Sequence, residues 1–123
     1  MSNSEQRIKR IAIVGSREFP YKWMVHDYIS AAVGMGWEIV SGGARGVDSW
    51  AADTADYYHL RLKVFHADWD THGKRAGFLR NQDIVNYADE VVAFWDGNSK
   101  GTAHTIKLAR DAGKLREVII VQR

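Results

Sequence analysis

The 123-residue sequence contains no cysteine and only one proline. Without cysteine, neither a disulfide framework nor a thiolate metal site is available, which is typical of a reducing compartment. No apolar run is long enough to span a membrane, and the polar start lacks the apolar stretch of a secretion signal. We therefore expect a cytoplasmic protein with a disordered tail at residues 1–7 and a single domain at residues 8–123.

A strong excess of charge is also absent. The chain has 17 lysine and arginine residues against 15 acidic ones, a formal net charge of +2. Dedicated nucleic-acid binders cluster their basic residues on one face, whereas here these residues are spread along the chain. The charge balance therefore permits an anionic small ligand and predicts that nucleic acid is not the partner.

Apolar periodicity predicts alternating strands and helices along the whole chain. Strands are expected at 8–14, 38–40, 62–66, 90–95 and 118–121. Helices are expected from near Tyr21 to Gly34, and at 47–58, 77–88 and 102–112, with a polar stretch at 67–76. This order predicts an α/β, Rossmann-like, doubly wound sheet of about five mainly parallel strands with helices on both faces. Ligands of such sheets bind at the carboxyl ends of the strands.

Glycine-rich loops follow the first, second and fourth predicted strands: Gly15-Ser16-Arg17, the segment 41–46, and the segment 96–101. Glycine lets backbone amides approach a ligand, and the helix N-terminus that follows favours negative charge. Any one of these loops is equally well explained as a tight turn. Because the carboxyl ends of parallel strands share one edge of the sheet, the three loops together predict a binding site there.

Two helices carry polar residues at the start of an otherwise apolar face. Arg80 and Asn81 begin such a face on the helix at 77–88, and Thr102 and Thr105 begin one on the helix at 102–112. Burying unpaired polar groups is costly, so we expect these side chains to face a polar pocket. A guanidinium binds phosphate in a bidentate manner, which makes Arg80 the leading ligand contact. The alternative is that Arg80 pairs with Asp48 or Asp96 and has a structural role.

Other candidates have two readings each. Asp48, in the first turn of its helix, either caps free amides or accepts hydrogen bonds from ribose hydroxyls. Ser16 either binds an anion together with Arg17 or closes a turn. Trp95 ends the fourth strand, where it either stacks on a base or belongs to the core or an interface. Trp69 lies in the polar stretch, which is either a mobile lid or a solvated connection.

Signatures of metal and cofactor binding are missing. The five histidines show no metal-ligand spacing. Neither a Gly-Lys-Ser/Thr phosphate loop nor a Gly-x-Gly-x-x-Gly fingerprint is present. We therefore expect no metal and no cofactor.

Several of these short motifs resemble the SLOG superfamily, in particular its branch of small YspA-like proteins. The resemblance runs from about residue 8 to residue 113 and rests on the segments 15–17, 41–48, 80–81 and 99–102. It implies a Rossmann-like fold that binds nucleotides or nucleotide-derived ligands. The superfamily includes the lonely-guy phosphoribohydrolases and the DNA-processing protein DprA, whose corresponding loop is similar to segment 41–48.

One departure from the phosphoribohydrolases bears on catalysis. Those enzymes have a Pro-Gly-Gly before the glycine-threonine turn and a catalytic glutamate one helical turn after it. Here residues 96–100 replace the first motif, and Thr105 stands where the glutamate is expected. Threonine cannot act as a general base, so hydrolysis of this kind would require Asp48 or Asp96. The chain is therefore expected to bind its ligand without catalysis.

The sequence thus favours a sensor or sequestering module for a nucleotide or an ADP-ribose-like ligand, assembled as a homo-oligomer. A glycosidic-bond hydrolase or ribosyltransferase is the first alternative, and a DprA-like binder of single-stranded DNA is the second. The ligand-binding residues are expected to be Gly15, Ser16, Arg17, Ser41, Gly42, Gly43, Arg45, Asp48, Arg80, Asn81, Trp95, Ser99, Gly101, Thr102 and Thr105.

Overall fold

The computed structural model of the chain describes residues 8–122, so the expected disordered tail at 1–7 lies outside the described residues. Five strands form one sheet in the order β3-β2-β1-β4-β5, and all neighbouring pairs are parallel. The strands are β1 (Arg10–Gly15), β2 (Glu38–Ser41), β3 (Arg61–Val64), β4 (Glu90–Trp95) and β5 (Leu115–Ile120). The helices are α1 (Lys22–Ala31), α2 (Val47–Tyr57), α3 (Trp69–His72), the 3-10 helix η2 (Gly73–Arg75), α4 (Ala76–Tyr87) and α5 (Lys100–Asp111).

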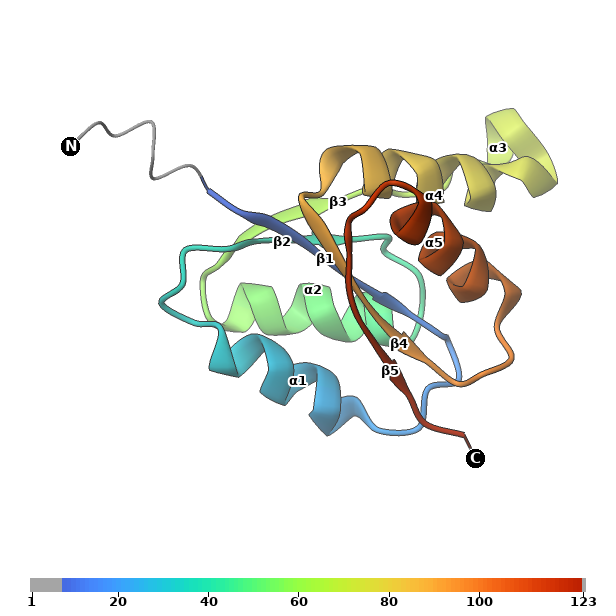
Figure 1. Cartoon of the computed structure of the whole chain (residues 1–123). Helices are drawn as coiled ribbons and strands as arrows, with labels where there is room; N and C mark the ends of the chain where they lie inside the picture. The colour runs from blue at the N-terminus through green and yellow to red at the C-terminus, as the bar shows by residue number, and fades with distance from the viewer. Residues whose placement is uncertain (1–7, 123) are drawn as a thin grey trace.

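The helices lie on both faces of this sheet, as Figure 1 shows. Helices α1 and α2 cover one face, and α4 and α5 cover the other. Successive strand residues point to opposite faces. Ile11 and Ile13 of β1 accordingly pack with α1 and α2, whereas Ala12 and Val14 pack with α4 and α5. The predicted Rossmann-like fold is confirmed.

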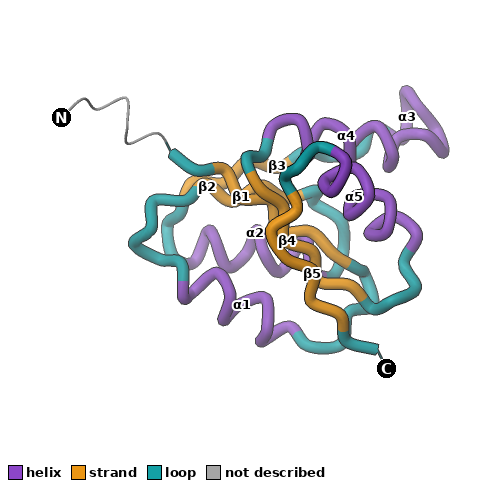
Figure 2. Tube along the Cα trace, in the orientation of Figure 1, coloured by secondary structure: helices purple, strands orange, loops and turns teal. Residues whose placement is uncertain are grey.

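The strand order reverses between β1 and β4. From β1 the chain moves outward through β2 to β3, then returns across the sheet to β4 and β5 (Figure 2). The loops after β1 and β4 therefore leave neighbouring strands in opposite directions, which opens a crevice between them. This crevice lies between the starts of α4 and α5.

Most expected boundaries differ from the structure by one to three residues, and two short helices were not expected. Strand β5 begins at Leu115, three residues before the expected start, because Arg116 and Glu117 are exposed on an edge strand that needs no apolar run. The polar stretch at 67–76 contains α3 and η2, and Asp68 caps α3 by accepting a hydrogen bond from the Thr71 amide at 3.2 Å. Among the described residues, no helix has the length and apolar character needed to cross a membrane.

Candidate functional site

A cavity of about 490 Å³ opens at the switch point of the sheet. Its walls come from the end of β1, the loops that follow β1, β2 and β4, the start of α2, the α3–η2 segment and the N-terminal parts of α4 and α5. They are formed by Val14, Gly15, Arg17, Glu18, Ala44, Asp48, Trp69, Lys74, Gly77, Phe78, Arg80, Asn81, Ile84, Asp96, Asn98, Ser99, Gly101, Thr102 and Thr105.

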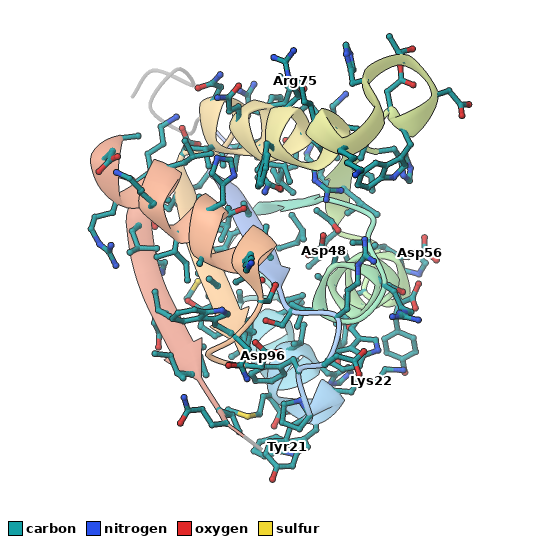
Figure 3. The ribbon with its side chains drawn as sticks, turned by 90° about the vertical axis from the view of Figure 1, so that its right-hand side faces the viewer. Tyr21, Lys22, Asp48, Asp56, Arg75 and Asp96 are labelled. Carbon is teal, nitrogen blue, oxygen red and sulfur yellow. The ribbon has the colours of Figure 1, made fainter. Side chains whose placement is uncertain are left out.

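Most of the ligand-binding residues expected from the sequence meet in this cavity. They are Gly15, Arg17, Asp48, Arg80, Asn81, Ser99, Gly101, Thr102 and Thr105. Both candidate catalytic carboxylates, Asp48 and Asp96, are also in the wall, and Figure 3 labels them beside the starts of α2 and α5. The side chains come together because the carboxyl ends of the strands and the N-termini of the following helices lie at one edge.

Asp48 is almost completely buried, with 5% of its surface exposed. Its Oδ1 accepts a hydrogen bond from the Gly15 amide at 3.2 Å, and its Oδ2 accepts one from the Ala44 amide at 3.4 Å. Burial raises the pKa of this carboxyl from 3.8 to about 6, although Arg80 and the two amides oppose the shift. Asp48 therefore joins two glycine-rich loops and also presents a titratable group to the cavity.

Arg80 spans the cavity from α4 to the β2–α2 loop. Its Nη1 donates to the Gly42 carbonyl, and its Nε donates to Oδ1 of Asn81 at 3.1 Å. Burial lowers the pKa of the guanidinium, while the nearby Asp48 carboxylate raises it. Asn81 in turn donates from Nδ2 to the Gly101 carbonyl at 3.3 Å, which links the guanidinium to the first turn of α5.

The turn between β4 and α5 is held by side-chain oxygens. Oδ1 of Asp96 accepts from the amides of Asn98 at 2.8 Å and Ser99 at 2.9 Å. Burial by itself raises the pKa of Asp96, but these amide hydrogen bonds outweigh it, so the pKa lies below its ordinary value. Ser16 is fully buried, and its Oγ accepts from the Asp96 amide at 3.1 Å. Asp96 and Ser16 thus fix the turn that places Ser99 and Thr102.

The remaining expected contacts lie outside the cavity wall: Ser16, Ser41, Gly42, Gly43, Arg45 and Trp95. The Ser41 hydroxyl donates to the Asp48 carbonyl at 2.8 Å, and the Trp95 indole donates to the Ser99 carbonyl at 3.0 Å. Arg45 is exposed and lies 3.7 Å from Glu18. Gly43 adopts a positive φ of 71° next to His66, where a side chain would not fit. These residues shape the loops that surround the cavity.

The structure adds residues that the sequence did not single out as ligand contacts. Trp69 and Phe78 both line the cavity and are each 52% exposed. Phe78 packs edge-to-face on His104, with ring centroids 4.6 Å apart. Lys74 of η2 adds a cation to the same wall. The sequence signal that could have identified Phe78 is its position on the exposed side of α4, two residues before the inward-facing Arg80.

Metal ligation has no support within residues 8–122. No group of three or more histidine, cysteine, aspartate or glutamate side chains could hold an ion there. The wall instead contains three cations that can contact an anion, Arg17, Lys74 and Arg80, together with the carboxylates of Glu18, Asp48 and Asp96.

Sequence comparison places the chain in a family. A family model described as DNA recombination-mediator protein A matches residues 2–65, just over half of the chain. The chain belongs to this family. The Gene 61 protein of Mycobacterium phage D29 is 36% identical over 115 residues, which cover 86% of this chain and 92% of that protein.

Structural comparison shows the fold that the chain shares with a solved structure. The chain is similar to DNA processing protein A from Helicobacter pylori, whose single-stranded DNA binding mode has been described. The TM-score is 0.75 with 21% sequence identity, and the match covers 100% of this chain and 70% of that one. At this identity the likeness shows a shared fold.

These comparisons correct two expectations from the sequence. The preference for a small nucleotide-derived ligand over DNA was wrong, as was the exclusion of a nucleic-acid partner. The family is one of DNA recombination mediators, and the structural neighbour binds single-stranded DNA. The error came from inferring the partner from the net charge and the spread of basic residues along the chain, which do not show that Arg17, Lys74 and Arg80 gather in one cavity.

Proposed function

We propose that this protein binds single-stranded DNA in the cavity between β1, β4, α4 and α5. The observation that carries the proposal is the combination of three cations, Arg17, Lys74 and Arg80, with the exposed rings of Trp69 and Phe78 in one cavity wall. Proteins that bind single strands pair phosphate-binding cations with aromatic rings on which unpaired bases stack. Membership in the DNA recombination-mediator protein A family supports the same function.

The two aromatic side chains favour a single strand over a duplex. In duplex DNA the base faces are already stacked, so an exposed ring on the protein gains little from contacting them. In a single strand these faces are free, and each stacked base contributes about 1–3 kcal/mol. The polar groups deeper in the wall, Asn81, Thr102 and Thr105, are suited to hydrogen bonds with phosphate or base edges.

The test is the binding of a labelled oligothymidylate, followed by fluorescence anisotropy at several salt concentrations. We expect saturable binding that weakens as salt rises, with a slope corresponding to about two to three phosphate contacts. A duplex of matched length should bind more weakly. Equal binding of single strand and duplex, or the lack of saturable binding at low salt, would refute the proposal.

A matched pair of variants tests whether the cavity is the site. Lys74→Ala removes a cation from the wall, whereas Lys22→Ala removes an exposed cation from α1, outside the wall. We expect Lys74→Ala to weaken binding and to reduce the salt slope by about one, and Lys22→Ala to leave both unchanged. Equal effects of the two substitutions would place the DNA elsewhere.

Three finer expectations remain predictions: a place in the YspA-like branch of the SLOG superfamily, a cytoplasmic location, and a single domain over residues 8–123. The segments 15–17 and 41–48, which carry the resemblance, form the loops at the end of β1 and between β2 and α2.

A further inference from the structure

A buried carboxylate already accepts hydrogen bonds from two backbone amides in the proposed DNA site. Asp48 accepts hydrogen bonds from the Gly15 and Ala44 amides, groups that would otherwise be available to a phosphate at the start of α2. A methyl group built on Gly42 would come within 2.5 Å of Asp48 Oδ2 and 3.0 Å of Arg80 Nη1. The carboxylate and the guanidinium therefore both lie next to Gly42.

Charged groups from four surrounding segments share the cavity with this carboxylate. Arg80 extends from α4, Arg17 and Glu18 from the β1–α1 loop, Lys74 from η2, and Asp96 from the β4–α5 loop. Three cations thus share the wall with three carboxylates, which makes the cavity formally neutral when all of them are ionised. A neutral cavity attracts a phosphodiester less strongly than one with a net positive charge.

Two further titratable or charged groups lie close by but outside the wall. His66 packs against Gly43 of the β2–α2 loop, and Arg45 of that loop pairs with Glu18 on the surface. Neither lines the cavity. Asp48 differs from the other two carboxylates of the wall, because Glu18 is exposed and Asp96 accepts two short hydrogen bonds from its own turn.

We propose that Asp48 takes up a proton from solvent when a DNA phosphate binds beside Arg80, so that pH controls the affinity of the cavity for the strand. This inference rests on the proposed function and concerns the regulation of the same site. Protonation gives the wall a net positive charge. It also changes Asp48 from an anion that repels phosphate into an acid whose O–H can donate a hydrogen bond to a phosphate oxygen.

The environment of the carboxyl supports this uptake. Burial raises the pKa of Asp48 to about 6, while Arg80 and Arg17 hold it down. A phosphate that binds to these two guanidiniums offsets their charge and adds its own negative charge, and both effects raise the pKa further. The complex then binds more protons than the free protein, so affinity must rise as pH falls.

The experiment measures the affinity for oligothymidylate from about pH 5 to about pH 8 at constant ionic strength, the range in which such a group titrates. We expect the wild-type protein to bind more tightly at low pH, by roughly tenfold for each pKa unit added by the bound phosphate. Asp48→Asn keeps the shape and a donor toward phosphate but cannot ionise. It should bind tightly across the range with most of the pH dependence lost.

Glu18→Gln is the matched control, since it removes one formal negative charge from the same wall at an exposed position. It should tighten binding and retain the wild-type pH dependence. Wild-type affinity that does not change with pH, or an Asp48→Asn variant that keeps the full dependence, would overturn the inference while the proposed function stands. Absence of oligothymidylate binding at every pH would overturn the proposed function, and this inference with it.

A second measurement covers the case in which Asp48→Asn does not fold. Carbon-detected NMR titration of the Asp48 carboxyl in the wild-type protein reports its pKa directly, with and without oligothymidylate. We expect the pKa to be higher in the complex. An unchanged pKa in a protein that binds the oligonucleotide would refute proton uptake by Asp48.

Discussion

Arg80 Nε donates a hydrogen bond to Oδ1 of the adjacent Asn81, 3.1 Å away. Asn81 Nδ2 donates to the Gly101 carbonyl and lies 3.3 Å from Nδ1 of His104. Burial lowers the pKa of His104, which favours the neutral ring that can accept this hydrogen bond. Since His104 also packs on Phe78, the network connects a proposed phosphate contact to a proposed stacking ring. Such support holds a binding group in place before the ligand arrives.

Replacing Arg80 should separate binding from folding. Arg80→Ala removes a charge-assisted contact, so oligothymidylate binding should weaken by about 1.5–3 kcal/mol. Arg80→Lys keeps the charge but loses the planar donors that reach Gly42 and Asn81, and should recover only part of the affinity. Anisotropy measures the affinity and thermal unfolding measures the fold. An Arg80→Ala chain that is unfolded would assign Arg80 a structural role instead.

The exposed rings of the cavity should contribute through base stacking. Trp69→Ala and Phe78→Ala should each weaken binding of single strands by about 1–3 kcal/mol, with little change in the salt slope, because no phosphate contact is lost. Trp23→Ala is a matched control, since Trp23 is 61% exposed on α1, outside the cavity wall. Titrations of all three variants at two salt concentrations test this. A loss of affinity in Trp23→Ala as large as in Trp69→Ala would argue against stacking in the cavity.

The free energy of unfolding should fall as the pH rises, because the stabilising contribution of Asp48 is lost when its carboxyl ionises. Its pKa is about 6 in the folded protein and 3.8 as the ordinary value, so the folded state binds more protons between these values. The stabilising contribution is therefore fully present below pH 3.8 and lost by the time the pH passes about 6. The total change is on the order of 3 kcal/mol.

Denaturant unfolding of the wild type and of Asp48→Asn at a series of pH values gives this contribution as the difference between the two curves. If the difference between the two curves does not vary with pH over this range, burial does not raise the pKa of the Asp48 carboxyl.

Gly15 is predicted to be required for folding in addition to lining the cavity. A Cβ atom at this position would lie 2.2 Å from the Phe94 carbonyl and 2.8 Å from Val47 Cγ2, both fixed in the core. We expect Gly15→Ala to lower the free energy of unfolding by about 1–3 kcal/mol or more.

Gly101→Ala is the comparison for this substitution. Gly101 lies in α5 and its Cβ would meet no heavy atom within 4 Å, so alanine should stabilise the helix by about 0.5–1 kcal/mol. Denaturant unfolding of both variants distinguishes these outcomes. Similar effects at the two positions would contradict the steric argument.

The sequence alone determined the fold and the edge of the sheet at which the cavity lies. Apolar periodicity records which side of each element is buried, and the helix faces that begin with Arg80 and Asn81 or with Thr102 and Thr105 showed polar groups where the sheet ends. Asn81, Thr102 and Thr105 are indeed buried at the cavity. Periodicity is a local property, so it can be read without knowing the tertiary structure.

Only the tertiary structure decided which groups meet inside the cavity and which of them already have hydrogen-bond partners there. Asp48 accepts a hydrogen bond from Gly15, 33 positions away in the sequence. Trp69 lines the same cavity as Phe78 because it lies in α3, a short helix in a polar stretch where the sequence pattern predicted none. Contacts of this kind depend on how loops pack against distant elements, which no spacing encodes. The same holds for the balance of three cations and three carboxylates, because charge acts through distance in space and a count along the chain contains no distances.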